Sequence, residues 1–300
     1  MVGVTLAVLD GTIANVALPT IASDFHASPS ISIWIVNGYQ LAIVTTLLPF
    51  AALGEIHGYR RVYLWGIALF TLASVGCMLS DSLTALTGFR ILQGFGAAGL
   101  MSVNTALLRY TVAREKFGVA LGINALVVAA AATIGPSLGG FILSALNWPW
   151  LFAINLPLGV LAIVLGIPSL PGSDLADRRF DWLSALLSAA TIGLVITIID
   201  SIGHELPWWS IAAQAAGCLI AAVFLVRREL LRIATALKKV GLTVLMTAER
   251  DSEYGEISRH RVEEFVADNV VILRNALDRE RRRRPIEVLK MRSSSPAAGG

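Results

Sequence analysis

Charged residues are scarce in this 300-residue chain: it has 24 Lys and Arg, 21 Asp and Glu, and a charged fraction of 15%. Soluble domains average about 25%. Hydrophobic residues make up 55% of the chain, and its mean hydropathy is +0.70. This composition excludes intrinsic disorder, a collagen-like chain and a lone nucleic-acid-binding domain, and it favours membrane spans.

Cysteine is nearly absent as well. Cys77 and Cys218 are the two cysteines, and both stand in apolar runs without paired spacing. Neither a disulfide framework nor a cysteine-based metal site is therefore expected, and we predict no metal and no cofactor.

The few charges are unevenly placed. Residues 1–226 hold 8 of the 24 basic and 10 of the 21 acidic residues, which leaves 16 basic and 11 acidic residues for the last 74. The chain therefore joins an apolar part to a charged tail.

Eight stretches of the apolar part are long enough to cross a bilayer, for which a helix needs about 20 mostly apolar residues. Residues 1–21 carry only Asp10, and residues 82–108 carry only Arg90. A turn at Asn147-Trp148-Pro149 divides residues 117–173 into two spans. The other four are residues 25–54, 62–80, 182–199 and 206–226.

Basic residues fall in alternate connections between these spans. One side has nine, namely Arg60, Arg61, Arg109, Arg114, Lys116, Arg178, Arg179, Arg227 and Arg228, and the other side has none. Because cytoplasmic loops retain Lys and Arg, we expect a multi-pass protein of the cell (inner) membrane with both ends in the cytoplasm.

Asp10 and Arg90 are the ionisable residues within the spans, and such residues are expensive in lipid. Their positions place them at similar depths below the outer surface, so we expect them to pair. Protonation of Asp10 would release Arg90, which is a route to proton coupling. A purely structural pair is the alternative. Gln93 lies one turn from Arg90 and shares its face, and Asn15 and Tyr39 are further polar groups in the spans.

Small residues and a proline interrupt the fifth span at Gly135, Pro136, Gly139 and Gly140. Proline bends a helix, and small residues four apart allow close helix contact. A packing kink and a gating element are both compatible with this pattern.

These residues together resemble the Major Facilitator Superfamily, and more narrowly its 14-span drug:proton antiporter family. The matching segments are residues 9–19 (LDGTIANVALP), 90–96 (RILQGFG), 135–140 (GPSLGG), 148–159 (WPWLFAINLPLG) and 180–183 (FDWL). The resemblance covers about residues 1–226. It implies an N-terminal six-helix bundle, two linker helices, alternating access and export of amphipathic drugs against proton flow.

The resemblance also implies roles for particular residues. Asp10 and Arg90 match the first-span acid and the fourth-span base of the transport path, and Gly135 and Pro136 match the antiporter motif. Residues 51–61 are similar to the gating loop between the second and third spans. The candidates in that loop are Glu55, Gly58, Arg60 and Arg61.

Transporters of this superfamily place substrate between two six-helix halves, whereas this sequence ends after the linker spans and a tail. We therefore expect an incomplete half-transporter. Its partners are the lipid bilayer, protons and a small-molecule substrate. A separate C-terminal half or a homo-oligomer stays open as a further partner.

The tail resembles the end of a RecA-like domain of the KaiC circadian-clock ATPase family, over about residues 237–292. Residues 270–273 and 286–289 are strand candidates, as are residues 242–246, and residues 261–267 are a helix candidate. The sequence lacks the G-x-x-x-x-G-K-[ST] phosphate loop, so we expect no ATP hydrolysis and no enzyme. Arg281–Arg284 is interpreted as a solvated strand entry and not as a nucleic-acid site.

We thus predict an all-α polytopic membrane protein followed by a small partial α/β tail. Its domains are a six-span bundle (residues 1–170), two linker helices (171–228) and a soluble cytoplasmic tail (229–300). The leading function is proton-coupled drug efflux. The alternatives are a membrane-tethered interaction module and a nonfunctional fusion product.

Overall fold

The computed structural model describes residues 1–172, 175, 180–203, 208–239, 269–273, 276–278, 281–283 and 286–291. The chain divides into two compact units, residues 1–219 and 220–300. The first unit is helical. The described strands belong to the second.

Among the described residues, eight helical segments are long and apolar enough to cross a membrane, as the sequence predicts. The elements are α1 (Val2–Asp24), α2 (Pro29–Ser32), α3 (Trp34–His57), α4 (Tyr59–Met78), α5 (Leu83–Thr111), η1 (Arg114–Lys116), α6 (Phe117–Ala145), α7 (Trp150–Ala153), α8 (Asn155–Ser169), α9 (Trp182–Gly203) and α10 (Trp208–Lys239). The helices α2 and α3 form one span, and α7 and α8 form another.

Local chemistry sets several helix boundaries. The hydroxyl of Ser82 accepts a hydrogen bond from the backbone N–H of Ala85 (3.3 Å) and caps the start of α5. The predicted turn at residues 147–149 lies between α6 and α7. Pro157 has no N–H to donate to the carbonyl of Ala153, four residues earlier, and this accounts for the break between α7 and α8.

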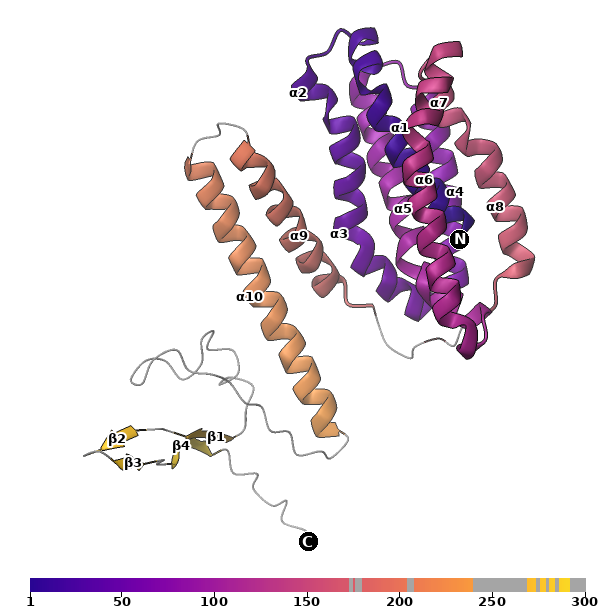
Figure 1. Cartoon of the computed structure of the whole chain (residues 1–300). Coiled ribbons are helices and arrows are strands. Elements are labelled where there is room, and N and C mark those ends of the chain that lie inside the picture. Colours follow the sequence, from indigo (N-terminus) through magenta and orange to yellow (C-terminus); the bar gives the residue numbers. More distant parts are fainter. Residues whose placement is uncertain are drawn as a thin grey trace. The chain divides into compact units, whose positions relative to one another are not determined.

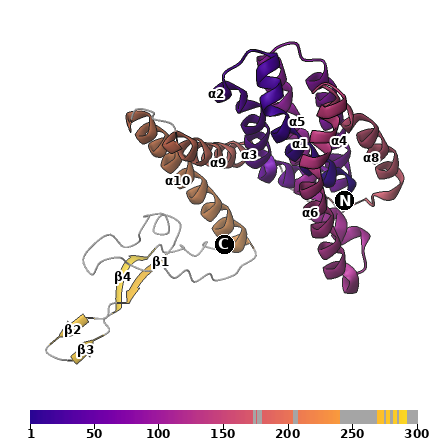
Figure 2. The same cartoon turned by 45° about the horizontal axis from the view of Figure 1, so that its top comes forward.

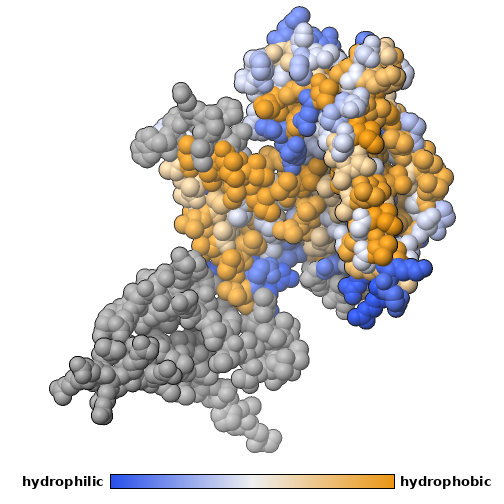
Figure 3. Space-filling model, in the orientation of Figure 1, coloured by the Kyte–Doolittle hydropathy of each residue, from blue (hydrophilic) through white to orange (hydrophobic). Residues whose placement is uncertain are grey.

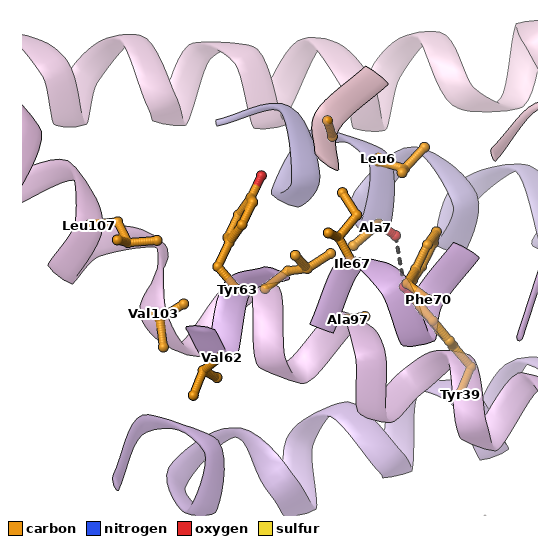
Figure 4. Packing of buried hydrophobic residues seen from close by; sticks show 12 residues of the cluster. Leu6, Ala7, Tyr39, Val62, Tyr63, Ile67, Phe70, Ala97, Val103 and Leu107 are labelled. Atoms are coloured by element: carbon orange, nitrogen blue, oxygen red, sulfur yellow. Dashed lines mark hydrogen bonds between the residues drawn. The ribbon is translucent and has the colours of Figure 1, made fainter. Parts of the chain in front are cut away.

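The helices α3, α4 and α5 pack against one another, α6 packs on α1, and α8 packs on α4 (Figures 1 and 2). Two apolar clusters form the core. One contains Tyr63, Ile67, Phe70 and Leu100, and the other contains Ile13, Ile35 and Phe152. Figure 4 shows part of the first cluster, with side chains from several helices converging between the ribbons. The helix α9 packs against α3.

The outside of the bundle is apolar. Figure 3 shows hydrophobic residues over the middle of the N-terminal helices and hydrophilic residues gathered toward their ends. Trp65, Leu72, Leu126 and Phe141 are each about 70% exposed or more. This is the surface expected of helices that face lipid.

The helix α10 is longer than the sequence predicts. The sequence predicts a last span over residues 206–226, but one continuous helix runs from Trp208 to Lys239. No proline or glycine separates the apolar stretch from Arg227 and Arg228, so nothing in the sequence ends the helix there.

In the second unit, β1 (Asn269–Leu273) pairs antiparallel with β4 (Ile286–Met291). These two strands confirm the predictions for residues 270–273 and 286–289. A second antiparallel pair joins β2 (Ala276–Asp278) and β3 (Arg281–Arg283), and the sequence pattern does not predict it. The candidates at 242–246 and 261–267 lie outside the described residues.

Candidate functional site

The centre of the bundle holds a buried ion pair between α1 and α5. Arg90 Nη1 donates to Asp10 Oδ2 at 2.5 Å, and the two side chains are 0% and 1% exposed. The pairing expected from their depths along the spans is therefore present. Within a bilayer the pair costs less free energy than two separate charges would.

The second carboxylate oxygen of Asp10 accepts from two amides. Gln93 Nε2 donates to Asp10 Oδ1 at 3.0 Å, and Asn155 Nδ2 donates to the same oxygen at 2.5 Å. Both amides also reach the hydroxyl of Ser74 on α4, at 2.8 and 3.4 Å. Four spans, α1, α4, α5 and the α7–α8 segment, thus meet at one carboxylate.

Arg90 has partners besides Asp10. Its Nη1 donates to Gln93 Oε1 (2.7 Å), and its Nε donates to the carbonyl of Ile35 (3.2 Å). The guanidinium carbon lies 4.0 Å from the centroid of the Tyr39 ring and 5.7 Å from that of Phe152. Rings at these distances attract a cation, so the site holds Arg90 in place by more than its charge partner.

Tyr39 itself is fixed by its hydroxyl. This group donates to the backbone carbonyl of Ala7 at 2.9 Å (Figure 4). The bond ties α3 to α1 about one helical turn before Asp10, and it keeps the ring against Arg90.

Two polar atoms of this cluster have no hydrogen-bond partner among the described residues. They are Arg90 Nη2 and Asn155 Oδ1, and both are buried. Unsatisfied buried polar groups are rare and costly, so each calls for an explanation.

Four of the five transport candidates from the sequence, namely Asp10, Arg90, Gln93 and Tyr39, meet at this site. Asn15 lies on an exposed part of α1, outside the cluster. Ser74 and Asn155 also belong to the cluster, although neither was among the candidates from the sequence. Asn155 carried one signal, since it is a polar residue directly before Leu156-Pro157 in an apolar run.

The candidate gating loop joins α3 to α4. Gly58 has a φ of 96°, which non-glycine residues rarely adopt, and so it allows the sharp reversal between the helices. Arg60 Nη2 donates to the carbonyl of Ile167 in the last turn of α8 at 2.6 Å. Glu55 lies half-buried in the last turn of α3, and Arg61 is exposed.

The residues of the Gly-Pro segment lie on two faces of α6. Gly135 and Gly139 are on a buried face, and Pro136 and Gly140 are on an exposed one. A Cβ at Gly135 would overlap the side chain of Thr12 on α1, and a Cβ at Gly139 would lie 3.4 Å from Ile13. Pro136 and Gly140 are exposed, and nothing lies within 4 Å of a Cβ at Gly140. Gly135 and Gly139 therefore let α6 approach the helix that carries Asp10.

Two other polar contacts link the spans. Asn104 on α5 donates to Asn124 on α6 at 3.1 Å. Trp148 Nε1 donates to Asp24 at the end of α1 at 2.7 Å. Within the part of the chain that the structure describes, no group of three or more His, Cys, Asp or Glu side chains could hold a metal ion.

Eight membrane-length helices and a charged pair buried inside the N-terminal bundle are the features of a multi-pass membrane protein of the transporter class. The chain belongs to the Major Facilitator Superfamily, whose sequence model matches residues 1–180. A model described as the KaiC ATPase matches residues 215–298.

Curated relatives match the N-terminal part. The transporter YebQ of Escherichia coli (strain K12) is 48% identical over 77% of this chain and 51% of YebQ. The riboflavin transporter RibZ of Clostridioides difficile (strain 630) is 36% identical over 73% of the chain and 49% of RibZ. The multidrug export protein EmrB of Escherichia coli (strain K12) is 33% identical over 74% of the chain and 44% of EmrB. The chain spans about half the length of these relatives.

Proposed function

We propose that residues 1–226 provide one half of a proton-coupled exporter of drugs or other amphipathic small molecules. In this proposal the chain lies in the cell (inner) membrane with both ends in the cytoplasm. Asp10 carries the proton and Arg90 competes with that proton for the carboxylate. The observation that carries the proposal is the ion pair of Asp10 and Arg90, which is buried at the centre of the bundle.

Proton exchange needs a site that tolerates both states of the acid. When Asp10 is ionised, Arg90 neutralises it. When Asp10 is protonated, Arg90 loses its counter-charge but keeps Gln93, the Ile35 carbonyl and the Tyr39 ring. These partners reduce the cost of a lone buried cation. The site therefore tolerates both the ionised and the protonated state of Asp10.

The substrate class rests on the relatives. EmrB is named as a multidrug export protein and RibZ as a riboflavin transporter. Both names indicate transport of small organic molecules, and identities of 33% and 36% favour neither substrate.

The test is a chimera in which residues 1–226 replace the matching half of EmrB, reconstituted in vesicles with an imposed pH gradient. We expect the gradient to drive transport of ethidium or riboflavin, and Asp10→Asn to abolish that transport. Asp24→Asn is the matched control, because an amide oxygen still accepts from Trp148 Nε1. Gradient-driven transport that survives Asp10→Asn would disprove the role of Asp10.

A second candidate function is a membrane-tethered interaction module, favoured by the KaiC match over residues 215–298. It requires that the tail bind a KaiC-family protein. Co-purification of the full chain with such a protein in detergent tests it. Binding that persists after deletion of residues 232–300 would contradict it.

A further inference from the structure

We propose that Asn155 is a positioning residue that follows the protonation state of Asp10 by reversing its side-chain amide. The inference rests on the proposed role of Asp10 as the proton carrier. It adds a residue and a physical step that the ion pair alone does not supply.

The amide of Asn155 is placed for the ionised form of Asp10 alone. Its Nδ2 donates to Asp10 Oδ1 at 2.5 Å, while its own Oδ1 is buried without a hydrogen-bond partner. The residue is 0% exposed. The structure thus holds a spare acceptor on the side chain that already contacts the carboxylate.

Protonation changes what Asp10 requires. An ionised carboxylate only accepts hydrogen bonds, whereas a protonated carboxyl also has one O–H to donate. With Nδ2 toward Asp10, Asn155 cannot accept that hydrogen. Rotation of the amide about its terminal torsion, which is broad for Asn, exchanges Nδ2 for Oδ1 and supplies the acceptor.

Gln93 cannot make the same change at low cost. Its Nε2 donates to both Asp10 and Ser74, and its Oε1 accepts from Arg90 Nη1 and lies 3.7 Å from Cys77 Sγ. Reversal would break all of these contacts. Reversal of Asn155 gives up two donated bonds, to Asp10 Oδ1 and, at 3.4 Å, to Ser74 Oγ, and no accepted bond. Of the two amides on Asp10, Asn155 is therefore the one that reverses at the lower cost.

The position of Asn155 links this reversal to the backbone. It is the first residue of α8 and follows the break after α7. Phe152, which lies near the Arg90 guanidinium, belongs to α7. A change at Asn155 therefore acts where the span is interrupted, between the acid on α1 and a ring that contacts the base.

Few other ionisable groups bear on this step. Arg90 of α5, Tyr39 of α3 and Cys77 of α4 surround the acid and its amides. The helices α2, α6, α7 and α8, which also pack around α1, contain no Asp, Glu, Lys, Arg, His, Cys or Tyr. Asp10 is therefore the group whose proton Asn155 can follow.

Infrared difference spectra between acidic and alkaline pH, taken on the full chain in lipid vesicles, test the proposal. We expect a carboxyl band that disappears in Asp10→Asn, and an amide carbonyl band that shifts when asparagine is isotope-labelled. In Asn155→Val the carboxyl band should move to higher wavenumber, because the O–H loses its acceptor. Threonine has nearly the same shape as valine but carries a hydroxyl that can accept a hydrogen bond. In Asn155→Thr the carboxyl band should therefore stay near its wild-type position.

Asn104→Val is the matched control, since Asn104 is also buried but donates to Asn124 and not to Asp10. It should leave the carboxyl band unchanged. Size-exclusion profiles establish that each variant is folded. If Asn155→Val does not fold, the labelled wild-type protein and Asn155→Thr decide the matter, because the labelled amide band should be present in the first and absent in the second.

The outcomes separate the two proposals. A carboxyl band at the same position in wild type, Asn155→Val and Asn155→Thr would overturn the inference and leave the proposed function intact. A labelled amide band that is absent or insensitive to Asn155→Thr would overturn it as well. The absence of any band sensitive to Asp10→Asn would mean that Asp10 takes no proton, and the proposed function would then fail together with the inference.

Discussion

The helices α5 and α6 have equal length and opposite surroundings. Each has 29 residues. An 18-residue apolar stretch of α5 has a mean hydropathy of 1.4, and 56% of it is buried. The corresponding stretch of the α6 span has a mean hydropathy of 2.1, and 11% of it is buried. The more hydrophobic helix is therefore the more exposed one.

This difference follows from the solvent. In water, burial of apolar surface drives packing, but lipid tails are as apolar as leucine and remove that force. Small and polar residues that fit closely then decide which helix lies inside. The buried face of α5 carries Arg90, Gln93, Gly94, Gly96 and Gly99, while α6 presents Leu126, Ile134 and Phe141 outward.

The largest expected effect is the loss of the charge at the centre of α5. Arg90→Met leaves the Asp10 carboxylate buried without a counter-charge and should lower the free energy of unfolding by about 3–5 kcal/mol. Denaturant titration in detergent micelles measures it. Arg109→Met, at an exposed arginine of the same helix, should change stability by less than about 0.5 kcal/mol.

A double variant sharpens this prediction. Asp10→Leu combined with Arg90→Met removes both charges and should be closer to wild type than Arg90→Met alone. Equal losses in the single and double variants would mean that the charges are not coupled.

Replacing one glycine by alanine in each helix, which adds a methyl group, should change stability by a smaller amount. A Cβ at Gly96 of α5 would lie 2.5 Å from the backbone nitrogen of Phe70, so Gly96→Ala should cost about 1–3 kcal/mol through overpacking. Nothing lies within 4 Å of a Cβ at Gly122 of α6, and Gly122→Ala should gain about 0.5–1 kcal/mol. Thermal unfolding of the two variants, compared side by side, would contradict the packing argument if the order were reversed.

The smallest effect concerns the polar contact that α5 and α6 share. Asn124→Ala removes the acceptor of the Asn104 amide and should cost about 0.6 kcal/mol, the average for such bonds between membrane helices. The same thermal assay measures it, with Asn15→Ala, at an exposed asparagine, as the control. A loss of stability as large as that of Arg90→Met would show that the hydrogen bond between these amides contributes more to stability than the comparison of α5 with α6 predicts.

Much of the fold follows from the sequence because the bilayer sets a length and penalises charge. Apolar runs with at most one charge located the eight spans, and the matched depths of Asp10 and Arg90 predicted their contact. The contribution of Asn155 could not be found in this way, because several asparagines stand in the spans and only the packing of α8 selects one. Ser74 is one small hydroxyl residue among many. The pairing of β2 with β3 depends on a cross-strand register that three-residue strands do not reveal.

The separation of the partners along the chain has a consequence for synthesis. Asp10 meets Arg90 across 80 residues and Asn155 across 145. The first helix thus leaves the ribosome well before the groups that complete its acidic centre. The bundle can close around this carboxyl only after the segment that carries Asn155 has been inserted, so α1 is among the last of these helices to reach its final surroundings.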